Sequence, residues 1–316
     1  MIYKREFDEE RKKCEKLTHI EEPISDSALI EIDKLFGAAD VLSMKYSEIH
    51  HDKIRNISII APLIVFFFLL YEAAEQHFLI FVVTGLILLL YYVYRQPNDE
   101  DAHEKYLEYR VLAETLRVQY FISKAGIKKN VIDILPWFTY IRIPLVKDVL
   151  SGLPTIETNK KESILDCWIR NQMKYHDGAH KKALKQLEKN EFYEKISLIA
   201  TIIFYVIALI FEISMMIYAP FDMHTAHWIR AGLKIGVGTA TAITIFLSNY
   251  YGKMSISSKV DEHLRMYWLY QKVEHEIIHT KEEHEDQIMY LAKECLTENT
   301  IWYSHQKKNK PDFAVE

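Results

Sequence analysis

Two long stretches of the chain, residues 57–94 and 196–251, are almost free of charged side chains, whereas the rest of the sequence is rich in them. Within the first stretch, residues 57–70 and 78–94 form apolar runs on either side of the polar segment 71–77. With its flanks, each run has about the 17–20 residues that a helix needs to cross a hydrocarbon core of about 30 Å. The pattern predicts a transmembrane helical hairpin.

The second stretch repeats this arrangement, with apolar runs at residues 196–218 and 228–251 joined by a turn at 219–225. Aromatic residues gather at the ends of the runs, as they do in interfacial belts; they are Tyr91, Tyr92, Tyr94, Tyr218, Trp228, Tyr250 and Tyr251. The alternative is two buried hairpins of a soluble protein, but the sequences FFFLL and LILLLYY offer no polar face. We therefore expect four spans, although the mean hydropathy of the whole chain is only -0.09.

Two hairpins place both termini and the central segment on the same side of the membrane. Lys and Arg cluster near the span ends on that side, whereas the first hairpin loop has none and the second has only Arg230 nearby. The positive-inside rule predicts that this side is the cytoplasm. The expected organisation is an N-terminal cytoplasmic helical segment (1–53), a first transmembrane hairpin (54–94), a central cytoplasmic helical region (95–195), a second hairpin (196–251) and a C-terminal cytoplasmic helix and tail (252–316).

The sequence also predicts helices in the segments outside the apolar runs. Nine glycines and eight prolines are few for 316 residues, and helical periodicity dominates between the apolar runs, which predicts an all-α integral membrane protein. We expect helices at 99–126, at 161–195 leading into the third span, and at 257–296 after the fourth. The three scattered cysteines fit a reducing compartment, with no disulfide framework.

The two halves of the chain resemble each other. Asp101, His103, Tyr106 and Tyr109 recur loosely after the second hairpin as Asp261, His263, Tyr267 and Tyr270. We interpret this as a duplicated unit of hairpin plus helix, with chance similarity of two juxtamembrane helices as the alternative.

The fourth apolar run carries a polar stripe. Lys234, Thr241, Thr244 and Ser248 fall on one helical face and predict a pore-lining surface, unless the hydroxyls bond within the bundle or to their own helix. Gly232, Gly236 and Ala240 have the small-xxx-small spacing that permits close helix packing.

Glu212 lies in the third run. We count it as a further pore-lining candidate because ionisable groups are costly in a bilayer, with a snorkelling interfacial carboxylate as the alternative.

The central segment is the only cytoplasmic part with a net positive charge, +3, so we expect an anionic ligand to bind there. Candidate ligand-binding residues are Lys128, Lys129, Arg142, Lys147, Lys160 and Lys161, in or beside the turn-rich stretch 128–158, together with Trp168, Arg170, Tyr175 and His176. The lysines and arginines of the first group also fit solvated surface charge, and the stretch also fits a connector between helices. Trp168, Tyr175 and His176 also fit, with Gln172, one face of a helix that packs on a neighbour.

No catalytic motif is present in the sequence. The histidines and glutamates of HEIIHTKEEHE (residues 275–285) are explained as well by a polar helix face as by a metal site. We expect no enzymatic activity, no cofactor and no metal.

The segments YRVLAETLRVQYFISKAGI (109–127), WIRNQMKYH (168–176) and ENTIWY (298–303), together with the two hairpins, resemble the SLATT-type membrane effectors of bacterial nucleotide-linked conflict systems. The resemblance implies a homo-oligomeric pore, expected to be a tetramer, in the bacterial inner membrane, whose opening depolarises the cell and arrests growth during phage infection. It also implies a nucleotidyltransferase-like partner enzyme that makes the controlling ligand. The two-hairpin layout is similar to the membrane components of Hailong-type defence systems, in which that ligand is single-stranded DNA. A non-conducting membrane scaffold that recruits a soluble partner is the alternative function.

Overall fold

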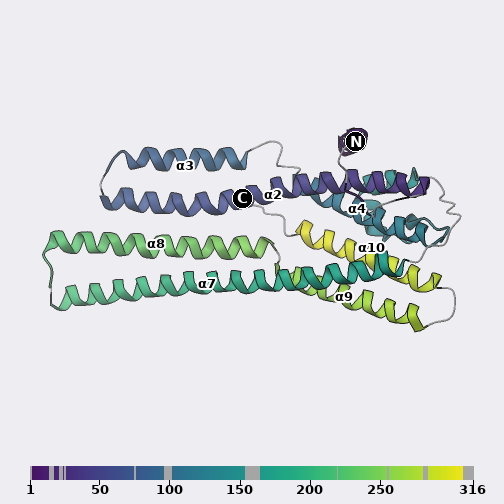
Figure 1. Ribbon diagram of the computed structural model, residues 1–316. Helices are drawn as coiled ribbons and strands as arrows, with labels where there is room; N and C mark the ends of the chain where they lie inside the picture. The colour runs from purple at the N-terminus through teal and green to yellow at the C-terminus, as the bar shows by residue number, and fades with distance from the viewer. Residues whose placement is uncertain are drawn as a thin grey trace. The chain divides into compact units, whose positions relative to one another are not determined.

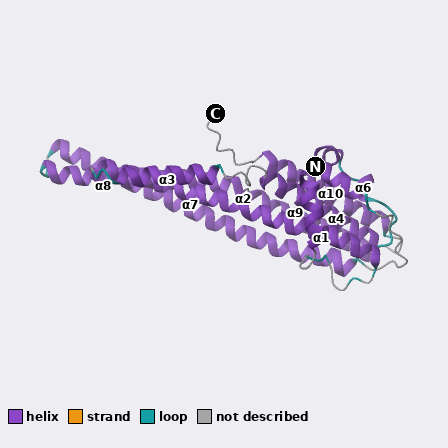
Figure 2. Ribbon diagram, turned by 90° about the horizontal axis from the view of Figure 1, so that it is seen from above, coloured by secondary structure: helices purple, strands orange, loops and turns teal. Residues whose placement is uncertain are grey.

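The computed structural model describes residues 2–13, 18–20, 24, 26–74, 76–95, 102–153, 164–218, 220–254, 256–279 and 284–308. These residues form helices and short connections and contain no strand (Figures 1 and 2), which confirms the all-helical prediction for this part of the chain. The elements are α1 (Ile2–Lys13), α2 (Ser27–Ala74), α3 (Leu79–Tyr94), α4 (Ala102–Lys124), η1 (Val131–Asp133), α5 (Trp137–Arg142), α6 (Pro144–Ser151), η2 (Leu165–Arg170), α7 (Asn171–Ile217), α8 (Met223–Met254), α9 (Ile256–His279) and α10 (Glu285–Lys308).

The chain divides into two compact units. The body unit comprises Met1–His50, Glu100–Lys181 and Lys259–Glu316, and the hairpin unit comprises His51–Asp99 and Lys182–Ser258. Helices α2 and α7 begin in the body unit and end in the hairpin unit.

The body unit is built around α4, because most of the residues of this helix are buried. Helices α10 and α6 pack against it. The aromatic rings of Phe121 and Trp168 stack with centroids 5.0 Å apart, so that α4 and η2 share one core.

The C-terminus of α4 is closed by Gly126, whose φ of 77° suits a residue without a side chain. The backbone N–H of Ile127 then donates to the carbonyl of Ile122 at 3.2 Å. Buried Gln119 holds the next segment, because its Oε1 accepts from the backbone N–H of Val131 at 2.8 Å. The chain therefore leaves α4 in a fixed direction and enters η1.

Two sequence predictions need correction here. The predicted single helix over 257–296 is wrong: α9 ends at His279, α10 begins at Glu285, and the two helices run in opposite directions (Figure 1). The physical reason is that α10 packs along α4 and buries Leu291, Ala292 and Leu296 there. The stretch 128–153 is also more ordered than predicted, since it forms η1, α5 and α6 and buries Val146 and Leu150.

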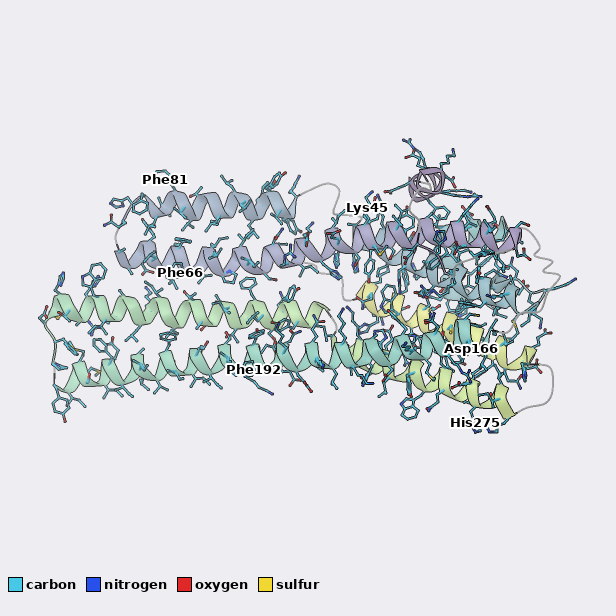
Figure 3. The ribbon with its side chains drawn as sticks, viewed as in Figure 1. Lys45, Phe66, Phe81, Asp166, Phe192 and His275 are labelled. Atoms are coloured by element: carbon cyan, nitrogen blue, oxygen red, sulfur yellow. The ribbon has the colours of Figure 1, made fainter. Side chains whose placement is uncertain are left out.

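The hairpin unit exposes its apolar residues. Phe81 of α3 is 76% exposed and points away from α2 (Figure 3), and most side chains of α7 between Ile196 and Ile217 are exposed as well. Among the described residues, three helical runs are long and apolar enough to cross a membrane: Ser27–Ala74, Leu165–Ile217 and Met223–His279. Leu79–Tyr94 is also apolar but shorter, with 16 residues.

A helix–hairpin–helix order occurs twice, as α2–α3–α4 and as α7–α8–α9. In each half, a histidine of the long helix lies beside a histidine of the returning helix. The ring centroids of His50 and His103 are 4.4 Å apart, and those of His176 and His263 are 5.3 Å apart. The recurrence of this pair supports the interpretation of a duplicated unit.

Candidate functional site in the second hairpin

The second hairpin carries two ion pairs near its turn. Arg230 of α8 donates to both carboxylate oxygens of Glu212 in α7, at 2.7 and 2.9 Å. Lys234, one helical turn further along α8, donates to Glu72 of α2 at 2.5 Å. The first pair closes the second hairpin, and the second pair joins the two hairpins. All four side chains remain 42–55% exposed.

Hydroxyl groups connect α7 and α8 further from the turn. Thr244 lies 2.7 Å from the hydroxyl of Ser197 and 3.4 Å from that of Thr201, while its own hydroxyl also reaches the carbonyl of Ala240 at 2.9 Å. Thr241 donates to the carbonyl of Val237 in its own helix, at 2.8 Å. Within one chain, therefore, Thr244 faces α7, as the helix-packing alternative describes.

The residues of the predicted polar stripe on α8 do not all face the same neighbour. Lys234 reaches α2, Thr244 reaches α7, and Ser248 is exposed, as is its neighbour Asn249. Polar groups thus remain on the outside of α8 in the single chain, at Arg230, Lys234, Ser248 and Asn249.

The small residues of α8 differ in what they contact. A Cβ on Gly236 would lie 2.8 Å from the ring of Phe204 in α7, and a Cβ on Gly238 would overlap the Cδ1 of Leu69 in α2. Gly232 has nothing within 4 Å at the same position, and Ala240 is half-buried. The close approach therefore involves Gly236 and Gly238. The sequence analysis overlooked Gly238, although the GxG spacing places it on the opposite side of the helix from Gly236.

Three candidate ligand-binding residues of the body unit, Trp168, Tyr175 and His176, lie in one aromatic cluster with Tyr270 and His263. Trp168 is buried in the core between Phe121 and Tyr270. Arg170 is held by Glu274 and Asp166, at 2.6 and 2.7 Å. Tyr175, 52% exposed, packs its ring beside those of His176 and His263.

The lysines and arginines of the central segment also have local partners. Lys129 pairs with Glu285 at 2.9 Å, Arg142 lies over the ring of Phe138, and Lys147 lies over the ring of Tyr140. Lys128 lies on the exposed surface. Lys160 and Lys161 fall outside the described residues.

A half-buried ionic network in the body unit is the main feature that the sequence analysis missed. Arg110 of α4 contacts Glu114 at 2.6 Å and Asp40 of α2 at 3.4 Å, and Arg117 also contacts Glu114 at 2.6 Å. Burial opposes ionisation, yet the two arginines hold the pKa of Glu114 below its usual value. An i, i+4, i+7 spacing of Arg, Glu and Arg on one helix is the signal that could have revealed the network.

The adjoining histidines sit in an environment that disfavours charge. The Nδ1 atoms of His176 and His263 are 3.1 Å apart. Burial, followed by the neighbouring His263, lowers the pKa of His176 to about 4. On α9, burial and then the charge of Glu298 raise the pKa of Glu262 to about 7. The environment of the body unit thus disfavours the charged forms of His176 and Glu262, beside a network of charged groups.

Among the residues that the structure describes, no group of three or more His, Cys, Asp or Glu side chains is arranged to hold a metal ion. His275 and His279 stack on each other with centroids 4.1 Å apart, and Glu283 of the same motif lies outside the described residues.

Comparison with known proteins gives no further assignment. No protein-family model, no curated protein and no solved structure matches the chain.

Proposed function

We propose that this protein is a four-span membrane effector that assembles into a homo-oligomeric, ligand-gated ion pore with both termini in the cytoplasm. The hairpin unit forms the membrane part, and the body unit responds to the ligand. The observation that carries the proposal is the set of polar groups that stay on the outside of α8, in a unit whose apolar runs otherwise expose mainly hydrophobic side chains.

The fourth span of this proposal is α3. Lys53 of α2 donates to the carbonyl of Tyr94 at 3.1 Å, which aligns the end of α3 with the charged start of the apolar part of α2. At about 1.5 Å per residue, 16 residues extend about 24 Å, and flanking residues or local thinning of the bilayer make up the difference. The two arms of the first hairpin then cross the membrane together.

The exposed polar groups of α8 favour an assembly over a single chain in lipid. Charged groups facing hydrocarbon are costly, so such groups normally face a bundle interior or a water-filled cavity. In an oligomer that turns α8 toward a common axis, Lys234, Ser248 and Asn249 line an aqueous path. The apolar outer faces of α3 and α7 then meet the lipid.

Control by a ligand is the second part of the proposal. The resemblance of residues 109–127, 168–176 and 298–303 to SLATT-type effectors supports a nucleotide or single-stranded oligonucleotide made by a nucleotidyltransferase-like partner, acting in phage defence at the bacterial inner membrane. To change the ratio of open to closed pores from 1:99 to 99:1, or the reverse, the ligand must bind the favoured state more tightly by about 5.5 kcal/mol. Several subunits of an oligomer can share this requirement.

The test is ion flux from liposomes that contain the purified full-length protein, with and without nucleotides or short single-stranded DNA. We expect flux that depends on the ligand. Ser248→Leu should reduce it because the change replaces an exposed hydroxyl of the path, whereas Ile245→Leu, a change at a 60% exposed apolar position of the same helix, should leave it unchanged. Absence of flux from a folded oligomer under every condition would favour the non-conducting scaffold.

A further inference from the structure

The hairpin unit contains an apolar groove between α2 and α8. Its volume is about 610 Å³, within the range of pockets that hold small organic ligands. The α2 wall contains Ile59, Pro62, Leu63 and Phe66, and the α8 wall contains Thr239, Ile243, Phe246 and Leu247. Figure 3 shows Phe66 in the space that α2 and α8 share.

The groove has one charged end. Arg55 lines it at the start of the apolar part of α2, and Tyr250 and Tyr251 line it at the end of α8. Arg55 contacts Asp52 at 2.8 Å and stays 59% exposed. A guanidinium has five N–H donors, so this contact leaves donors for a further anion.

The length of the groove matches one leaflet of a bilayer. From residue 55 to residue 66, α2 rises about 16 Å at about 1.5 Å per residue. Half of a hydrocarbon core of about 30 Å is about 15 Å. The charged end therefore lies at the headgroup level when Phe66 lies near the bilayer midplane.

The walls of the groove are open to a ligand. Ile59 is 54% exposed and Ile243 is 39% exposed, although both belong to an inter-helix groove. The hydroxyl of Thr239 is buried at the deep end without a hydrogen-bond partner in the structure. Pro62 has no N–H, so α2 cannot bond the carbonyl of Ser58, which also lines the groove.

We propose that this groove binds an anionic phospholipid of the leaflet next to Arg55, with an acyl chain between α2 and α8 and the phosphate at Arg55. The guanidinium of Arg55 complements the phosphate, and the apolar groove, which is as long as one leaflet is thick, complements the acyl chain. A helix of a second copy fits less well, because it would need an apolar groove along the whole span. This inference depends on the membrane location of the hairpin unit and not on ion conduction.

The experiment measures lipid retained by the full-length protein, using native mass spectrometry after delipidation and re-addition of phosphatidylglycerol or phosphatidylcholine. We expect wild type to retain phosphatidylglycerol in preference to phosphatidylcholine. Leu247→Trp fills the groove and should lower retention of both lipids several-fold. Leu88→Trp is the matched control, because Leu88 is 62% exposed on α3 and does not line the groove.

Arg55→Gln tests the headgroup contact separately. It should abolish the preference for phosphatidylglycerol while phosphatidylcholine binding persists, and since Arg55 is a surface residue this variant decides the question if Leu247→Trp does not fold. An unchanged lipid preference in Arg55→Gln overturns the proposal. Dissociation of the oligomer by Leu247→Trp, with lipid retention unchanged, also overturns it and assigns the groove to a second copy. Ion flux of wild type reports on the pore independently.

Discussion

The body unit buries its large apolar residues around α4, whereas the hairpin unit leaves such residues on its surface. Leu107, Leu112 and Leu116 of α4 are fully buried, but Ile202, Ile210 and Ile213 of α7 are about half exposed. In the apolar windows of the three span-sized helical runs, only 11–17% of the residues are buried within the chain. The difference teaches that the body unit has an apolar core of its own, whereas the hairpin unit has helices that are long and apolar enough to cross a membrane.

Their charged groups differ in a related way. The body unit gathers Arg110, Glu114 and Arg117 into a half-buried network, while the hairpin unit keeps Glu212–Arg230 and Lys234–Glu72 half exposed. Removing a partner from the first network leaves an uncompensated charge in the protein interior.

The largest effect is expected for Glu114→Gln. This change leaves Arg110 and Arg117 without their shared carboxylate, and we expect a loss of about 2–4 kcal/mol in the free energy of unfolding. Thermal or denaturant unfolding in detergent measures it. Glu9→Gln, which breaks the exposed pair with Arg5, is the control and should change stability by less than about 0.5 kcal/mol. Equal losses of stability in Glu114→Gln and Glu9→Gln would show that the half-buried network contributes no more to stability than an exposed ion pair.

In the hairpin unit, Gly236→Ala should cost about 1–3 kcal/mol because the added Cβ collides with the ring of Phe204. Gly232→Ala on the same helix meets open space and should not lower stability. The comparison of their melting temperatures in detergent separates packing from helix propensity. A matching loss in both variants would count against the close contact of α7 and α8.

The third prediction concerns pH in the body unit. Because burial and Glu298 raise the pKa of Glu262 to about 7 from its ordinary value of 4.5, wild type loses stability as the pH rises from 4.5 to 7. Glu262→Gln keeps this side chain neutral. It should therefore be more stable than wild type by on the order of 1–2 kcal/mol at pH 8, with the advantage shrinking toward pH 5. Unfolding at a series of pH values measures this difference, and a flat profile would contradict it.

The smallest effect is expected for Thr244→Val, which removes the hydrogen bond to Ser197 between α7 and α8. Such bonds in membrane proteins contribute about 0.6 kcal/mol on average. Thr241 donates to the carbonyl of Val237 in its own helix, so Thr241→Val should have a smaller effect on unfolding in detergent. A greater loss from Thr241→Val would show that its hydroxyl has a partner outside the single chain.

The sequence alone determined the helical class and the apolar segments. Helical periodicity and the apolar runs are local properties, so residues 57–70, 196–217 and 228–251 could be placed inside helices without knowledge of any neighbour. The same is true of α4, whose pattern and terminal Gly126 are both visible in the sequence. The remaining apolar run corresponds to α3, which has only 16 residues, so its role as the fourth span is a proposal.

Only the tertiary structure decided which polar residues meet. Periodicity places Lys234 and Thr244 on one helical face, but Lys234 contacts Glu72, 162 residues earlier, and Thr244 contacts Ser197, 47 residues earlier. The partition of α9 and α10, the burial of Trp168 and the network of Arg110 with Asp40 likewise depend on contacts between distant segments. A local sequence pattern indicates which face of a helix is polar, but the residues that contact this face are determined by the packing of segments that are distant in the sequence.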